Sequence, residues 1–399
     1  MATLRNLALI SLILCATFAR ALDVSAKSAI IIDAESGQVL WQKDANTPRY
    51  PASTTKIMTA MLLLEHCLPS DWIVGPKGVD KIEPSSMNMR VGEKVSARGM
   101  LYALMLRSAN DGCVAVAYHI SGSVPAFAKL MNQRAKEIGC LNTNFNNPNG
   151  LNDKKHTTTA FDLALIAREA MKYEEFRKVV RTQSQPIVRS INHKDLLMKS
   201  HNKWLAKDMT ADGIKTGYTR DAGKCYVGSA TRDGYRLITV ILKSEDWQLD
   251  HQNMLNWAYK NHARVKVATP GMEVSRVTVE NSTPSELPLI VRDEIYQIRR
   301  VAPNMAPNVA INLTGELKAP IAEGQELGTV TFSDANGWTK TVPFYAGAST
   351  EYDPPLLGTT RGKAGFGILG LALVAGVFGL KTRSRRAKAY AQTARSSIF

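Results

Sequence analysis

The interpretation of this chain starts from residues 51–64, which read PASTTKIMTAMLLL. Pro51 suits the first turn of a helix, and the almost wholly apolar run after Lys56 predicts that this helix is buried. Residues three apart share one helix face, so the Lys56 amine can reach the Ser53 hydroxyl. Burial disfavours a charged amine, so Lys56 can act as a neutral general base, while the helix N-terminus favours an oxygen that acquires negative charge.

The pattern Ser-x-x-Lys is weak when taken alone. It recurs at Ser200 and Lys203, where no buried helix follows. A second candidate motif, Ser108-x-Asn110, lies between predicted helical runs at 99–107 and 112–120, where a loop can present both side chains to a cleft. Any single Ser-x-Asn pair is more typical of a surface loop.

The motif Lys215-Thr216-Gly217 precedes a predicted pair of strands. Its lysine and threonine can bind a substrate carboxylate, and its glycine lets a substrate backbone approach an edge strand. An exposed turn explains the motif equally well by itself. The order of the three motifs favours the functional interpretation of each one. Ser-x-x-Lys is followed by Ser-x-Asn 55 residues later and then by Lys-Thr-Gly, and this order within one exported domain is improbable by chance.

The predicted elements form an α+β domain at 22–264 and a small all-β domain at 265–350. Strand-like runs precede and follow a mostly helical middle at 53–180; they lie at 29–33, 39–42, 224–230 and 235–242, and a helix at 246–262 comes last. Strands at both ends imply one antiparallel sheet in which the ends of the domain meet. After residue 265, short alternating runs are separated by Pro, Gly and Asn.

Both ends of the chain resemble targeting segments. Residues 1–21 have a basic start, an apolar run and small residues at the end, as in a cleaved secretory signal, with a buried first helix as the alternative. Residues 364–380 carry no charge and can span a membrane, with an interfacial helix as the alternative. The basic residues of 381–399 predict a cytoplasmic tail, and 351–363 predicts a linker to the membrane.

The formal charge of +15 is concentrated at these ends. Residues 22–360 contain 40 basic and 35 acidic residues, which is ordinary for a soluble domain and does not favour nucleic-acid binding. The seven histidines show no zinc-binding spacing, and no glycine-rich phosphate loop is present in the sequence, so we expect neither a metal nor a cofactor. Four cysteines follow the predicted signal, and their pairing stays open: Cys67, Cys113, Cys140 and Cys225.

With their neighbours, the motifs resemble those of the serine D-alanyl-D-alanine carboxypeptidases, the low-molecular-mass penicillin-binding proteins of peptidase family S11. The matching segments are 51–59 (PASTTKIMT), 108–111 (SAND), 147–151 (NPNGL) and 212–219 (DGIKTGYT). This resemblance implies a penicillin-binding, β-lactamase-like domain and a C-terminal β-domain, exported to the extracytoplasmic face of a bacterial membrane. It also implies hydrolysis of the terminal D-Ala-D-Ala bond of peptidoglycan stem peptides, and acylation by penicillins.

The resemblance also implies a role for each motif residue. Ser53 attacks the carbonyl and Lys56 takes its proton, while the backbone N–H groups of Ser53 and Tyr218 hold the oxyanion. Ser108 passes the proton to the leaving D-alanine, and Asn110 holds the substrate's amide backbone.

In this scheme Lys215 and Thr216 face the terminal carboxylate of the substrate, and Lys215 also helps to keep Lys56 neutral. Gly217 lets the substrate backbone bind along the edge strand. Tyr218 stands where some members of the family have histidine.

Two other functions compete with this one. A class A β-lactamase needs a deacylating glutamate in a Glu-x-x-Leu-Asn setting, and no glutamate between 110 and 215 has that context. A membrane-tethered pseudoenzyme that only binds peptidoglycan is the second alternative, against which the intact motifs argue. The balance between carboxypeptidase, endopeptidase and transpeptidase activity stays open, as does the oligomeric state.

Overall fold

The structure is a computed structural model that describes residues 22–300, 307–335 and 337–354. The predicted signal at 1–21 and the predicted membrane segment at 364–380 lie outside the described residues, as do the basic tail and most of the linker. The chain forms two compact units: one runs to Arg264 and includes a short return from Ile298, and the other begins at Val265.

The first unit is built on a five-stranded sheet in the order β2-β1-β9-β8-β7. These strands are antiparallel: β1 (Ser28–Asp33), β2 (Val39–Lys43), β7 (Ala211–Thr219), β8 (Gly223–Arg232) and β9 (Tyr235–Ser244). Strand β1 pairs with β9 without interruption, from Ser28 opposite Leu242 to Asp33 opposite Leu237. The start and end of the domain therefore meet in one sheet, as the sequence predicts, and β7 is an edge strand.

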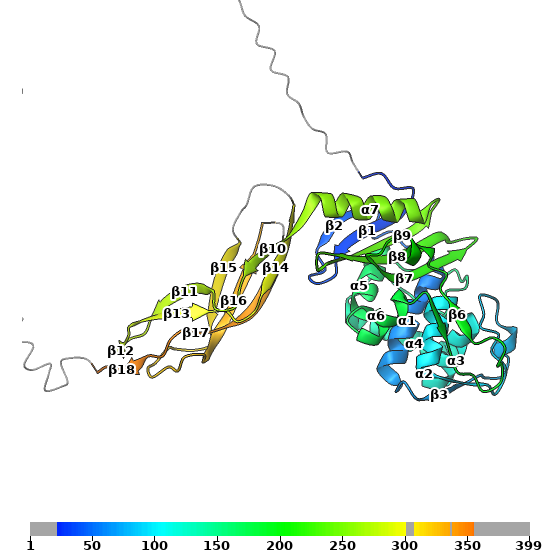
Figure 1. Cartoon of the computed structure of the whole chain (residues 1–399), viewed down its shortest axis with the longest axis horizontal. Helices are drawn as coiled ribbons and strands as arrows, with labels where there is room; N and C mark the ends of the chain where they lie inside the picture. The colour runs from blue at the N-terminus through cyan, green and yellow to red at the C-terminus, as the bar shows by residue number, and fades with distance from the viewer. Residues whose placement is uncertain (1–21, 301–306, 336, 355–399) are drawn as a thin grey trace, which may run out of the picture. The chain divides into compact units, whose positions relative to one another are not determined.

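Helices cover both faces of this sheet (Figure 1). Helix α7 (Trp247–Asn261) lies on one face, and the helices on the other are α1 (Lys56–His66), α2 (Ala97–Tyr102), α3 (Asn110–Ser121), α4 (Val124–Ile138), α5 (Ala160–Ala170) and α6 (Glu174–Arg181). Strand β1 is buried on both sides because its side chains alternate between two cores: Ile30 and Ile32 join the core under α1, whereas Ala29 and Ile31 join the core under α7.

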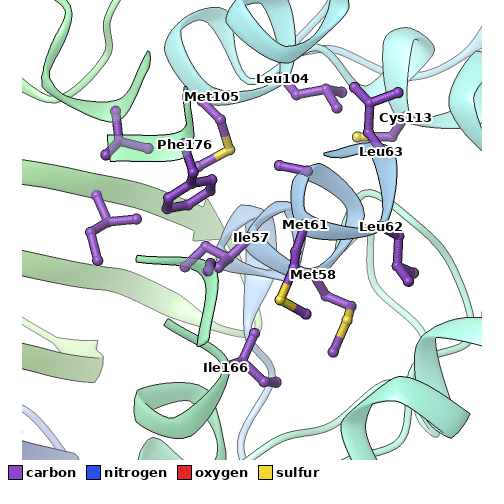
Figure 2. Close-up of a cluster of buried hydrophobic side chains, with 14 of the residues drawn as sticks. Ile57, Met58, Met61, Leu62, Leu63, Leu104, Met105, Cys113, Ile166 and Phe176 are labelled. Carbon is purple, nitrogen blue, oxygen red and sulfur yellow. The ribbon is translucent and has the colours of Figure 1, made fainter. Parts of the chain in front are cut away.

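Helix α1 runs through the centre of the larger core. Apolar side chains lie on every face of α1, and the residues from Lys56 to Leu63 are all buried, with Lys56 and Thr59 as the polar members. Figure 2 shows Ile57, Met58 and Met61 of α1 amid side chains from several other elements, among them Leu104, Met105, Cys113, Ile166 and Phe176. Each such large apolar side chain contributes about 1.5–3 kcal/mol on burial, so this packing fixes the helix that carries Lys56.

Short elements complete the first unit. They are the turns η1 (Ala52–Thr55), η2 (Val79–Lys81), η3 (Ala103–Arg107) and η4 (Lys203–Ala206), and the strand pairs β3 (Trp72–Val74) with β4 (Lys94–Ser96) and β5 (Ser184–Pro186) with β6 (Leu197–Lys199).

The second unit consists of strands. A five-stranded sheet has the order β11-β13-β17-β16-β15, with β11 (Glu273–Thr278), β13 (Glu286–Ile290), β15 (Asn308–Leu313), β16 (Glu326–Ser333) and β17 (Thr339–Ala346). Two further pairs are β10 (His262–Ala268) with β14 (Ile295–Arg300) and β12 (Ser282–Thr283) with β18 (Glu351–Tyr352).

Strand β17 was missed by the sequence prediction because Pro343 interrupts its pattern. Pro343 is tolerated there because β17 pairs with β13 only at Tyr345 and Ala346, which leaves that edge free at the proline. Among the residues that the structure describes, no helix has the length and apolar character needed to cross a bilayer.

Candidate active site

Ser53 lies in a tight turn just before the central helix. Residues Ala52–Thr55 form the 3-10 turn η1, and α1 begins at Lys56. The sequence predicts a regular helix through Ser53, but the turn tightens because the N–H and the hydroxyl of Thr54 both donate to the carbonyl of Pro51, at 3.3 and 2.6 Å. Side chains three apart eclipse in a 3-10 turn, so Lys56 still faces Ser53.

The backbone next to Ser53 is strained. Ala52 has a φ of 49°, a left-handed conformation that costs a non-glycine residue about 1–3 kcal/mol. Gly150 packs directly on this residue: its own φ is +86°, and a Cβ placed there would lie 1.8 Å from the Ala52 carbonyl oxygen. Only glycine fits at position 150, and its close approach holds the strained turn in place.

Lys56 is fully buried and makes three polar contacts. Its Nζ donates to Ser53 Oγ at 3.0 Å, to Asn110 Oδ1 at 2.6 Å and to the carbonyl of Asn149 at 2.7 Å. Burial lowers the pKa of Lys56 from 10.5 to about 8, against the opposing influence of nearby Cys113 and Asp111. The amine can therefore lose its proton within the physiological range while it remains within hydrogen-bonding distance of the Ser53 hydroxyl.

The second motif brings two side chains to the cleft by different routes. Ser108 ends the π-helical turn η3 in a left-handed conformation with φ 64°, and Asn110 is the first residue of α3. Asn110 accepts from Lys56 and donates through Nδ2 to the Glu83 carbonyl at 2.8 Å, which leaves one amide hydrogen for a substrate. Within the part of the chain that the structure describes, the Ser108 hydroxyl makes no hydrogen bond to Ser53 or Lys56.

The segment 147–156 supplies two groups to which the sequence reasoning gave no role. Asn149 offers its backbone carbonyl to Lys56, which no residue-type pattern can reveal. His156 accepts from the N–H of Asn146 at Nδ1, at 3.0 Å, so its Nε2 carries the hydrogen that is donated to Thr55 Oγ1 at 2.9 Å. Burial lowers the pKa of His156 to about 4, which keeps the ring neutral in this structural role.

The third motif lies within the edge strand β7, beside η1. A Cβ at Gly217 would lie 3.0 Å from the backbone nitrogen of Ser53 and 3.2 Å from Ala52 Cβ. Besides the predicted approach of substrate, this glycine permits the close approach of the Ser53 backbone. Tyr218 follows with its side chain 68% exposed at the cleft.

Lys215 is the second buried lysine of the site. Its Nζ donates to the Thr216 carbonyl at 3.0 Å. Burial, with the charge of Lys56 adding to it, lowers the pKa of Lys215 to about 7. Repulsion between two ammonium groups is mutual, so the pair carries fewer than two protons near neutral pH.

The predicted site residues converge on one cleft. Two cavities of about 480 and 530 Å³ adjoin Ser53, which lines both together with Tyr218. Ser108, Thr216 and Gly217 line the first cavity, and Asn110 lines the second. Lys56 and Lys215 lie buried beside them, at 0% and 1% exposure. The four cysteines after the predicted signal are all free thiols.

Comparison with known proteins agrees with this geometry. Residues 15–246 match the family model described as D-alanyl-D-alanine carboxypeptidase. The chain belongs to this family, peptidase family S11. Residues 263–352 match the model of the C-terminal domain of penicillin-binding protein 5.

Individual relatives cover most of this S11 family member. The D-alanyl-D-alanine carboxypeptidase DacF of Bacillus subtilis is 32% identical over 76% of this chain and 80% of its own length. The crystal structure of penicillin-binding protein 5 from Haemophilus influenzae is 25% identical, with a TM-score of 0.67 over 82% of this chain and 98% of that one. A Streptococcus pneumoniae structure, PBP3, shares the fold at 23% identity, with a TM-score of 0.71 over 82% of this chain and 99% of that one.

Proposed function

We propose that this protein is a serine D-alanyl-D-alanine carboxypeptidase, which removes the terminal D-alanine from peptidoglycan pentapeptides through an acyl-enzyme on Ser53. The observation that carries the proposal is the buried amine of Lys56, 3.0 Å from the Ser53 hydroxyl, with a pKa lowered to about 8. A serine and an adjacent neutral base are the minimum equipment for acyl transfer without histidine or metal. Membership of the S11 family supports the same substrate class and acylation by β-lactams.

In the acylation step, Ser53 Oγ bonds to the carbonyl carbon of the penultimate D-alanine while its proton passes to Lys56 Nζ. The carbonyl oxygen becomes an oxyanion between the backbone N–H groups of Ser53 and Tyr218. The contact between Gly217 and the Ser53 nitrogen supports this pairing, because it brings β7 against η1 at that point. One such donor typically contributes a factor of about 100–1,000 in rate.

In the collapse of this intermediate, the peptide C–N bond breaks and the leaving amine takes a proton that Ser108 relays from Lys56. Thr216 faces the terminal carboxylate on this side, with Lys215 buried next to it, and Asn110 holds the amide backbone of the acyl part. A water molecule then attacks the ester, with Lys56 again as the base, and releases Ser53.

Fluorescent penicillin tests this function directly. We expect stable labelling of the wild-type protein, no labelling of Ser53→Ala, and release of D-alanine from a pentapeptide only by the wild type. Labelling without D-alanine release would favour the peptidoglycan-binding pseudoenzyme, and rapid loss of the label would favour a β-lactamase.

We also propose that residues 1–21 are a cleaved secretory signal and that residues 364–380 anchor the protein in the cell membrane. The enzyme would then act on the extracytoplasmic face, with residues 381–399 in the cytoplasm. The support is compositional: the uncharged stretch 364–380 is followed by a basic flank, and cytoplasmic flanks are enriched in Lys and Arg. A substrate in the cell wall requires such a location.

A further inference from the structure

The two cavities that meet at Ser53 differ in charge. We call the cavity of about 480 Å³ the basic arm, because Lys203 and Lys224 line it, with His201, and no carboxylate side chain does. Ser108 and Thr216 open onto this arm.

The cavity of about 530 Å³ carries both signs of charge, and we call it the mixed arm. Glu83, Arg220 and Asp221 line it, together with the amide side chains of Asn149 and Asn152. The Arg220 side chain is exposed to solvent at the cleft, and so are the two carboxylates.

These charges fix the direction in which a stem peptide lies. The leaving D-alanine ends in a free carboxylate, which the cations of the basic arm attract. Ser108, the proposed donor to the leaving amine, opens onto the same arm. The acyl part of the peptide, on the other side of the bond that Ser53 attacks, therefore extends into the mixed arm.

The segments that carry the charged groups of the mixed arm lie close to the site residues. The backbone carbonyl of Glu83 accepts from Asn110 Nδ2 at 2.8 Å, and Asn110 Oδ1 accepts from Lys56. Asp221 accepts from Asn152 Nδ2 at 2.9 Å, which orients its carboxylate. An extended peptide advances about 3.3 Å per residue, so the residue that precedes the D-alanine pair lies in this arm.

We propose that the mixed arm is a subsite for a third stem residue whose side chain ends in both an ammonium and a carboxylate, which is a diaminodicarboxylic acid. Arg220 pairs with the carboxylate of that side chain, and the acidic side chains that line the same arm, Glu83 and Asp221, attract the ammonium. A lysine at the same position satisfies only the acidic partners, and an acetylated lysine satisfies none. This inference rests on the proposed function, because it assigns a specificity to the same cleft.

Three synthetic pentapeptides that differ only at the third residue test the subsite: meso-2,6-diaminopimelate, L-lysine and Nε-acetyl-L-lysine. The measurement is kcat/KM for D-alanine release by the full-length enzyme. We expect the diaminopimelate peptide to be the best substrate and the acetyl-lysine peptide the poorest. Exposed ion pairs contribute about 0.2–1 kcal/mol, so each step of preference is at most about fivefold.

Two variants that replace a charged side chain with neutral glutamine separate the partners. In Arg220→Gln the preference for diaminopimelate over lysine is lost, while kcat/KM for the lysine peptide changes less than twofold. In Glu83→Gln the preference for lysine over acetyl-lysine falls. Arg181→Gln, at the exposed end of α6 and outside both arms, is the matched control and leaves all three values unchanged.

Equal kcat/KM values for the three peptides, or an equal loss for all of them in Arg220→Gln, would overturn the subsite while the carboxypeptidase function stands. Release of D-alanine from none of the peptides would overturn both, because the subsite presupposes the reaction.

Discussion

At the scale of single residues, Lys56 combines a catalytic position with an unusual protonation equilibrium. The side chain has no exposed surface, and burial is the largest cause of its lowered pKa of about 8. Asp111 opposes this change: its carboxylate is buried, accepts from the N–H groups of Met87 and Met89, and favours the charged form of Lys56. The pKa of Lys56 therefore depends on a balance between desolvation and nearby negative charge.

This balance predicts how acylation depends on pH. In the proposed mechanism the neutral amine is the base, so the second-order rate constant for acylation by penicillin should rise with pH and level off above about 8, the pKa of Lys56. Asp111→Asn removes the negative charge that raises this pKa, so the rising limb should move to lower pH. Asp23→Asn, at an exposed site, is the matched control.

The pH at which the acylation rate constant reaches half of its plateau is informative even if Asp111→Asn loses stability. Partial unfolding lowers the plateau itself without moving that half-maximal pH. A limb that stays at the wild-type pH in Asp111→Asn would show that Asp111 does not tune Lys56.

At the scale of elements, the wall of the cleft depends on a buried ion pair. Arg189 lies between β5 and β6, and its guanidinium donates to Glu93 at 2.8 and 3.0 Å and to the Met87 carbonyl at 2.8 Å. Both charged side chains have 0% exposure. Because Glu93 also accepts from the N–H of Arg90, this pair fixes the segment after Glu83 that forms one side of the cleft.

Breaking this pair on one side should be costly. Arg189→Met leaves the Glu93 carboxylate buried without its partner, and we expect a loss of about 3–5 kcal/mol in the free energy of unfolding. The double variant Arg189→Met, Glu93→Leu removes both charges and should be more stable than Arg189→Met alone. Urea denaturation of the four proteins in the cycle measures both effects.

Equal or greater destabilisation in the double variant would contradict this account. It would mean that packing and the backbone contacts of Arg189 and Glu93 outweigh the unpaired charge.

At the scale of the whole molecule, the S11 family match covers the catalytic unit, and a second match, to the C-terminal domain of penicillin-binding protein 5, covers the unit that begins at Val265. The described residues of both units end before the predicted anchor at 364–380. The site residues named above all belong to the first unit.

Removal of residues 361–399 should therefore give a soluble enzyme. We expect it to fractionate away from membranes while it keeps wild-type kcat/KM for D-alanine release from a pentapeptide in solution. The full-length protein, assayed in detergent, is the reference. A truncated protein that folds but cannot cleave the peptide would show that the tail does more than anchor the enzyme.

The sequence alone predicted most of the elements and which side chains would come together at the cleft. The pattern of apolar residues predicted β1, β8, β9 and the central helix, because these elements are buried in the fold and their sequences are correspondingly apolar. The spacing of Ser53 and Lys56 predicted that the two side chains meet, and the structure places Lys56 Nζ 3.0 Å from Ser53 Oγ because residues three apart share one turn, whether that turn is α or 3-10. Strand β17 was not predicted, because Pro343 interrupts the sequence pattern typical of a strand. Its pairing with β16 nevertheless continues on both sides of the proline.

Only the tertiary structure decided how these groups work together. The carbonyl of Asn149, the ring of His156 and the close packing of Gly150 and Gly217 on residues 52–53 come from segments far apart in the chain, and a backbone carbonyl has no sequence signal. The lowered pKa values of Lys56 and Lys215 likewise depend on how completely the folded chain excludes water from two amines. Desolvation is a property of everything packed around a group, so no local pattern of residues could supply it.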